Sequence, residues 1–331
     1  MPVLDRAELE LYIYDGTSGG YATSDLRYEL SKTRISSQDN VVFEISELVR
    51  DYIDLTFNDD YLSRTKWVTA VTRLYDADGE EFATGSPVTS HYLAMDGYGY
   101  FEDGINPQLS DNLLMSNTTI YLPENTAGRL PILAEGVGKV TIDSVDTQIT
   151  DNGNSNQKIQ YITIPANSNT VQVYDTDDAT LLKTVTVNSV CEPKFTPYKV
   201  TFANKYGAYQ DMYFFKKSVE SMNVTDELYK ANIIDLANVT YATYKGQQER
   251  YNVSATKKVS LNSGFVNEDF NLAIEELLLS ENVWIRWEGR TLPVIVKTKD
   301  HTYKTSLNDK LINHTLDFEF AFSKINNIKY C

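Results

Sequence analysis

The sequence contains little cysteine and little histidine. Its 331 residues include two cysteines, Cys191 and Cys331, and three histidines, His91, His301 and His314. Two distant cysteines exclude a disulfide framework and a cysteine-based zinc cluster. The histidines match no metal-ligand spacing such as H-E-x-x-H. We therefore expect Cys191 to be a filler or interface residue and His314, on an apolar strand face, to be a core residue.

Basic runs and long apolar runs are also missing. The chain has 30 Lys and Arg against 46 Asp and Glu, a net charge of −16, with no basic run longer than a pair. A phosphate backbone is bound by a cationic face, so we expect no specific nucleic-acid binding. No uncharged apolar run approaches the roughly 20 residues of a membrane-spanning helix, which predicts no membrane insertion. The first residues lead directly into strand-like sequence and not into a signal peptide, which predicts a protein made in a cytoplasm.

Catalytic sequence motifs are absent too. The chain has no G-x-S-x-G, P-loop or dinucleotide-binding glycine pattern. Acidic residues crowd positions 76–80 and 175–178, where a calcium loop is the alternative to a plain solvated turn. A glycosidase uses two carboxylates that need not be close in the sequence. Among 46 acidic residues some pairs will lie close in the fold by chance, so they do not indicate a glycosidase. We expect no enzyme activity, no cofactor and no bound metal.

Aromatic residues are abundant, with 23 Tyr and 13 Phe. Aromatic and β-branched residues favour pleated, half-buried surfaces, which predicts a mainly β protein. The length suits two or three domains. Composition and turn signals place them at residues 1–117, 118–192 and 193–331.

The first domain, residues 1–117, is predicted to be β-rich with one helix. Ala7, Leu9, Leu11 and Ile13 alternate on one face of a strand. A stripe of apolar residues at helical spacing predicts a helix at 44–54. The domain closes with a glycine and aromatic loop at 96–101.

The second domain, residues 118–192, has no helical periodicity. It has short strand patterns at 119–122, 139–142, 159–164, 170–174 and 182–187, separated by turn clusters. Strands at this spacing predict an inserted immunoglobulin-like β-sandwich.

The third domain, residues 193–331, is predicted to be β-rich with one helix at 267–280, which Asn267 could cap. An aromatic strand at 212–215 precedes this helix. A strand at 283–287, a hairpin at 294–304 and an alternating strand ending at Phe322 follow it.

Six strings of the third domain carry a resemblance to a known family. They are YKVTF at 198–202, NKYGAY at 204–209, MYFFKK at 212–217, GFVNEDF at 264–270, VWI at 283–285 and KTSLNDKLI at 304–312. Together they resemble structural proteins of tailed bacteriophages that infect Bacteroidetes-type hosts. The resemblance covers about residues 190–328.

This resemblance implies a virion protein of the phage tail, made in the cytoplasm of the host bacterium. The implied role is a distal-tail or baseplate ring component that joins the tail tube to the tip or fibres. A tail-tube or head-tail connector subunit is the alternative. The implied architecture is a β-sandwich with a flanking helix in the first and third domains. The implied partners are further copies of the chain, through β pairing, and other tail, baseplate or fibre proteins.

Apolar residues of the third domain are the predicted subunit contacts, because a ring subunit needs strand edges and apolar faces that meet its neighbours. They are Met212, Tyr213, Phe214, Phe215, Trp284, Trp287, Val294, Val296, Leu316, Phe318, Phe320 and Phe322. Alternatively, these side chains fill the core of the subunit itself.

A function of another class is a glycan-binding adhesion module. Tyr98, Tyr100 and Phe101 would then stack on a sugar, since an aromatic ring presents an apolar face and tyrosine adds a hydroxyl.

Overall fold

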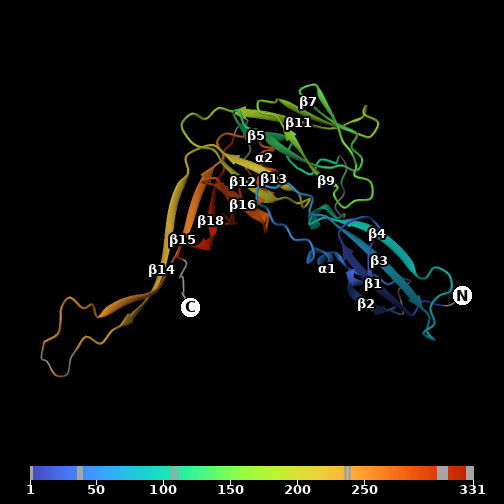
Figure 1. Ribbon diagram of the computed structural model, residues 1–331, viewed down its shortest axis with the longest axis horizontal. Helices are drawn as coiled ribbons and strands as arrows, with labels where there is room; N and C mark the ends of the chain where they lie inside the picture. Colours follow the sequence, from blue (N-terminus) through green and yellow to red (C-terminus); the bar gives the residue numbers. More distant parts are fainter. Residues whose placement is uncertain are drawn as a thin grey trace. The chain divides into compact units, whose positions relative to one another are not determined.

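The computed structural model describes residues 3–35, 40–105, 109, 112–234, 237, 240–303 and 312–325. The chain divides into two compact units. Unit 1 consists of Met1–Cys191, Thr201–Met212 and Asp269–Asn282, and unit 2 consists of Glu192–Val200, Tyr213–Glu268 and Val283–Cys331. Both units are built mainly of β-strands, so the predicted mainly β class is confirmed (Figure 1).

The N-terminal sheet of unit 1 has the strand order β2-β1-β3-β4. Its strands are β1 (Arg6–Tyr14), β2 (Leu26–Thr33), β3 (Lys66–Tyr75) and β4 (Val88–Ala94). The predicted alternation in β1 is confirmed, since Leu9, Leu11 and Ile13 are buried in one core cluster. The opposite face of β1 buries Tyr12 and Tyr14 as well, because they pack with Val71 of β3 in a second cluster.

Helix α1 (Ser46–Arg50) is shorter than the helix predicted at 44–54. Its N-cap, Ile45, has no side chain that can bond the free amides, and after Arg50 the chain closes tighter turns through Tyr52 N to Val49 O (3.0 Å). The apolar stripe is nevertheless used, because Val49 and Ile53 lie in the same core cluster as β1.

The strands between residues 118 and 191 form two sheets. One has the order β5-β11-β10-β7-β8 and the other pairs β6 with β9. The strands are β5 (Thr119–Pro123), β6 (Gly128–Leu133), β7 (Lys139–Ile142), β8 (Val145–Gln148), β9 (Ile159–Ile164), β10 (Thr170–Tyr174) and β11 (Leu181–Val190). Each predicted strand is present, and β6 and β8 were missed. Strand β8 is short and exposed throughout, so it offers no apolar pattern to detect.

Two further strands, β12 (Tyr198–Ala203) and β13 (Tyr209–Phe214), are neighbours in one sheet. In unit 2, β16, β17, β18, β15 and β14 follow one another in antiparallel order. Their bounds are β14 (Val219–Lys230), β15 (Gln248–Asn262), β16 (Val283–Trp287), β17 (Arg290–Val296) and β18 (Thr315–Ser323). His314 is buried just before β18, as predicted.

Helix α2 (Phe270–Leu279) begins three residues later than predicted, and its N-cap is Asp269 and not Asn267. The Asp269 carboxylate does not cap the helix. It accepts hydrogen bonds from the backbone N–H of Thr118 (2.5 Å) and Thr119 (3.0 Å) and from the Thr118 hydroxyl (3.2 Å). Asp269 therefore ties the start of α2 to the start of β5 within unit 1.

Replacing this carboxylate should destabilise unit 1. Asp269→Ala leaves two backbone amides without their acceptor, and we expect it to lower the free energy of unfolding by about 1–3 kcal/mol. Urea unfolding followed by circular dichroism measures this. Glu124→Ala, at an exposed position of the same unit, is the control and should change stability by less than about 0.5 kcal/mol. Equal stability of the two variants would contradict the role of Asp269 in tying α2 to β5.

Candidate functional site

Most of the predicted subunit contacts lie inside this chain's own core. The buried residues are Met212, Phe214, Phe215, Trp284, Trp287, Val294, Leu316, Phe318 and Phe320. Tyr213 and Val296 are partly exposed, and Phe322 is 55% exposed. For the buried residues the structure supports the alternative that their apolar faces fill the subunit's own core.

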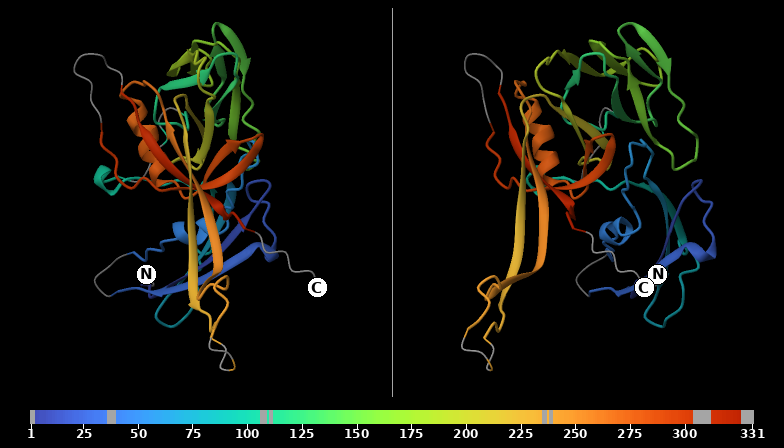
Figure 2. Two further views of the ribbon diagram at one scale, coloured as in Figure 1. Left: turned by 90° about the vertical axis from the view of Figure 1, so that its left-hand side faces the viewer. Right: turned by 60° about the vertical axis from the view of Figure 1, so that its left-hand side comes forward.

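Unit 2 instead exposes a long β-hairpin, which we call the arm: β14, the described part of the connection, and β15 up to Ala255. Every residue of β14 is exposed. Pairing of β15 with β18 ends at Thr256 and Ser323, so beyond this point β14 and β15 continue as a two-stranded ribbon (Figure 2). A bulge between Thr225 and Glu227, with Asn252 at φ 49°, interrupts the ribbon.

The outer edge of β14 has no neighbouring strand in the described part of the chain. An unpaired edge presents a row of backbone N–H and C=O groups that can pair with another strand. Natural proteins blunt such edges with short strands, proline, charged side chains or bulges. Strand β14 carries acidic residues and one bulge, but it has 12 residues and no proline. The arm is therefore a template for strand pairing.

Apolar side chains accompany this open edge. The large exposed ones on the arm are Val219 (56%), Met222 (58%), Val224 (42%), Leu228 (58%), Tyr229 (46%), Ile234 (62%), Tyr241 (56%), Tyr244 (86%), Tyr251 (46%) and Val253 (37%). Tyr229 and Tyr251 also contact each other edge to face, with ring centroids 5.6 Å apart. Burying these side chains against another molecule would be favourable, because apolar surface gains free energy when it leaves water.

Ion pairs connect the two strands of the arm. Its β14 strand carries Glu220 and Asp226, which pair with Lys257 (2.7 Å) and Arg250 (2.8 Å) of β15. These surface ion pairs add little to stability. They connect the two strands of the ribbon, and the carboxylates lie on its outer strand.

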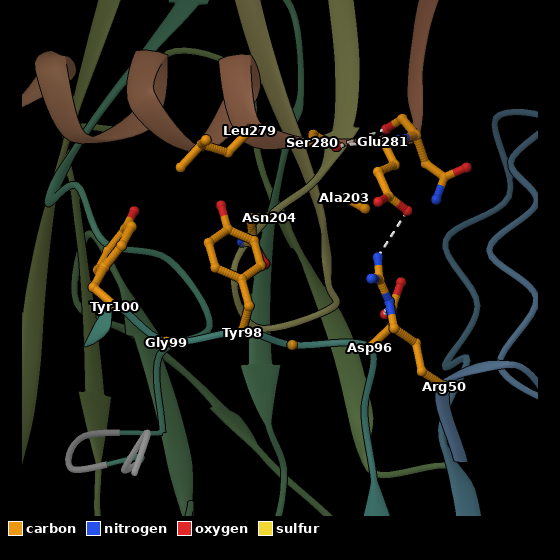
Figure 3. Close-up of a pocket in the computed structure, with 12 residues that line it drawn as sticks. Arg50, Asp96, Tyr98, Gly99, Tyr100, Ala203, Asn204, Leu279, Ser280 and Glu281 are labelled. Atoms are coloured by element: carbon orange, nitrogen blue, oxygen red, sulfur yellow. Dashed lines mark hydrogen bonds and ion pairs between the residues drawn. The ribbon is translucent and has the colours of Figure 1, made fainter. Parts of the chain in front are cut away.

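Unit 1 contains a pocket of about 370 Å³ formed by segments that are distant in the sequence. Its lining comes from the end of α1, the loop after β4, the end of β12 with the next residue, and the end of α2 with the residues after it. The lining residues are Arg50, Asp96, Gly97, Tyr98, Gly99, Tyr100, Ala203, Asn204, Leu279, Ser280, Glu281 and Asn282. Figure 3 shows Tyr98 and Tyr100 side by side, both directed towards α2. The structure thus brings together two of the three predicted glycan contacts, whereas Phe101 is fully exposed and does not line the pocket.

Ion pairs hold the polar end of the pocket. Arg50 donates from Nε to Asp96 Oδ1 (2.7 Å) and from a terminal nitrogen to Glu281 Oε2 (2.8 Å) (Figure 3). Two carboxylates therefore fix one guanidinium, which keeps its side chain in place. Sequence reasoning missed both contacts, because the partners lie 46 and 231 positions from Arg50.

The aromatic end of the pocket is partly withdrawn from water. Burial raises the pKa of the Tyr98 hydroxyl and of the Tyr100 hydroxyl, so both stay neutral over the physiological range. Their rings contact each other edge to face at 6.0 Å, and the Lys205 ammonium lies 5.7 Å from the centre of the Tyr100 ring. The loop thus presents two neutral, ordered rings.

A buried carboxyl lies next to this pocket, at Glu276 of α2, which is 1% exposed. It accepts hydrogen bonds from the Ser116 hydroxyl and from Lys205 N (3.4 Å). Burial raises the pKa of Glu276, because the charged form loses its hydration. The two donors stabilise the carboxyl but do not offset its desolvation.

This carboxyl should make stability depend on pH. A raised pKa in the folded state contributes stability that is present below the ordinary glutamate pKa of about 4.3 and is lost as the pH rises through the raised value. Glutamine does not titrate, so we expect Glu276→Gln to lack this loss. The unfolding free energy of the variant should therefore rise relative to that of the wild type as the pH increases from acid to neutral. Urea unfolding at several pH values measures the difference. Parallel curves for the variant and the wild type would contradict the placement of Glu276, and Glu124→Gln is the exposed control.

The acidic clusters act as turn acceptors. Asp76 Oδ1 accepts from the N–H groups of Asp78 and Glu80, both at 3.0 Å, and Asp177 Oδ1 accepts from Ala179 N and Thr180 N. Within the described residues, no group of three or more His, Cys, Asp or Glu could hold a metal ion. Of the two cysteines, Cys191 is exposed and Cys331 lies outside the described residues.

No α-helix in the described ranges combines the length and the apolar character needed to cross a membrane. A scan against protein-family models, a search of curated proteins and a search of solved structures each find no match to this chain.

Proposed function

We propose that this chain is an assembly subunit that associates with further copies of itself through the arm of unit 2. The observation that carries the proposal is a long, fully exposed edge strand, β14, with apolar side chains along it. The subunit would belong to the tail of a bacteriophage virion, foremost as a distal-tail or baseplate ring component, and would have no catalytic role.

The ribbon of β14 and β15 lacks the further strands that stabilise most sheets. A two-stranded hairpin in water is marginally stable, and sheets usually need three or more strands or a packing partner. From Ala255 towards the tip of the hairpin, the arm consists of β14 and β15 alone in the described part of the chain. A strand from another copy would complete the sheet, satisfy the open edge and cover the apolar side chains.

The position in the tail rests on the sequence resemblance. Subunits of closed rings carry complementary surfaces that repeat around a symmetry axis, and an arm that pairs between neighbours provides one such surface. The proposal includes an immunoglobulin-like sandwich at 118–192, supported by its two sheets, and a flanking helix, α2. Other tail, baseplate or fibre proteins would be the remaining partners.

The mass of the full-length protein in solution tests this proposal. Light scattering at increasing protein concentration should give a multiple of the 37.5 kDa chain, and negative-stain images should show closed rings or short tubes. A monomer at every concentration would overturn self-assembly. Immunogold labelling of virions that carry the chain tests its location, because label on the head and not the tail would overturn the tail assignment.

A further inference from the structure

The pocket of unit 1 has the size of a small-ligand site. Its volume of about 370 Å³ lies in the lower part of the range of about 300–1,000 Å³ that ligand pockets occupy. All of its lining residues belong to unit 1. Four segments build it, and the Arg50 ion pairs with Asp96 and Glu281 bind three of those segments together.

One side of the pocket is apolar and aromatic. Tyr98, Tyr100 and Leu279 form this side (Figure 3). The Tyr98 hydroxyl is buried and has no hydrogen-bonding partner of good geometry among the described residues. This buried hydroxyl is out of reach of a ligand, so Tyr98 contributes its ring to the pocket.

The other side of the pocket is polar. Arg50 uses two of its five N–H donors in the ion pairs with Asp96 and Glu281, and each carboxylate retains free lone pairs. Donors and acceptors therefore lie next to each other, as adjacent hydroxyl groups require. One guanidinium against two carboxylates leaves a net negative charge, which disfavours phosphate and acidic ligands.

From this arrangement we propose that the pocket binds one ring of a neutral sugar. The C–H face of the ring would lie against Tyr98 and Tyr100, since aromatic rings favour apolar contact with their faces. Its hydroxyl groups would bond Arg50, Asp96 and Glu281. This role is additional to self-assembly through the arm, which belongs to unit 2.

Saturation-transfer NMR on the full-length protein tests the proposal, with glucose, galactose, mannose and N-acetylglucosamine as millimolar probes. We expect at least one probe to receive saturation. Leu279→Trp should reduce the signal about tenfold or more, because the indole fills the pocket. Leu279 is 54% exposed, so the fold should tolerate the change. Leu62→Trp, at a position that is 48% exposed in the same unit, is the matched control and should keep the full signal.

Three results would overturn the sugar site. The first is no signal from any of the four probes, and the second is an unchanged signal in Leu279→Trp. The third is stronger binding of glucuronic acid, inorganic phosphate or N-acetyl-lysine amide than of the neutral sugars, since the first two are anionic and the last tests capture of a cationic peptide side chain. Each result leaves the assembly proposal untouched, because the mass measurement depends on the arm and not on this pocket.

Discussion

Phe318→Ala is expected to lower the free energy of unfolding by about 3–5 kcal/mol. The Phe318 ring is fully buried in unit 2 and meets the Phe214 ring edge to face, with centroids 5.9 Å apart. Alanine would remove the apolar surface that the ring buries on folding, and it would leave a cavity that the surrounding sheet cannot fill. Denaturant unfolding measures the loss, and Phe318→Leu, which keeps much of the volume, should cost only about 1 kcal/mol.

The exposed phenylalanine of the same strand provides the control. Phe322 is 55% exposed, so Phe322→Ala should change stability by less than about 0.5 kcal/mol. This pair distinguishes a core role from a contact role on β18. A Phe318→Ala variant that remained as stable as the wild type but associated less tightly would show that Phe318 is a subunit contact after all.

Charges on the arm are expected to abolish self-association without unfolding the chain. Met222 and Val224 of β14 are 58% and 42% exposed. Replacing both by glutamate adds two charges to a strand that already carries Glu220 and Asp226. Truncation of a hot-spot contact costs about 2 kcal/mol or more, and the added charges repel at a paired edge, so the double variant should raise the dissociation constant about tenfold or more. Light scattering across a dilution series measures this constant.

A matched double variant separates the arm from general effects of added charge. Val88→Glu together with Val145→Glu makes the same charge change at strand positions of unit 1 that are 46% and 67% exposed. We expect this control to associate like the wild type. If both double variants dissociated equally, the arm would not be the assembly surface.

Alternation and helical spacing predicted the parts of the fold that bury one face. In β1 and β18 every second residue is apolar, and burial follows that alternation over most of each strand; the exceptions are Tyr12 and Tyr14, which are also buried, and Phe322, which is exposed. The apolar stripe of α2 located that helix, although the helix begins at Phe270 and not at Asn267. Both helix predictions found the buried residues but not the helix ends. An apolar stripe marks which residues are buried, whereas hydrogen bonds at the ends decide where the helix begins. For this reason α1 keeps its buried residues but only one turn of helix.

The arm and the pocket could not be predicted in full, for different physical reasons. Strand β14 is exposed on both faces, so its apolar residues follow no period of two. The pocket depends on tertiary contacts, such as that between Arg50 and Glu281, which local spacing does not encode. Tyr98 and Tyr100 were found because a glycine and aromatic loop is conspicuous in the sequence, yet Phe101 of the same loop lies outside the lining.

Amide hydrogen exchange of β14 at low and high protein concentration tests directly whether the arm mediates assembly. Backbone amides that pair with another copy exchange slowly, because exchange requires the pairing to open. If the arm mediates assembly, exchange in residues 219–230 should slow as the protein associates, with little change on the exposed strands β4 and β8 of unit 1. Unchanged exchange in β14 across a concentration range in which the measured mass increases would contradict the arm as the assembly surface.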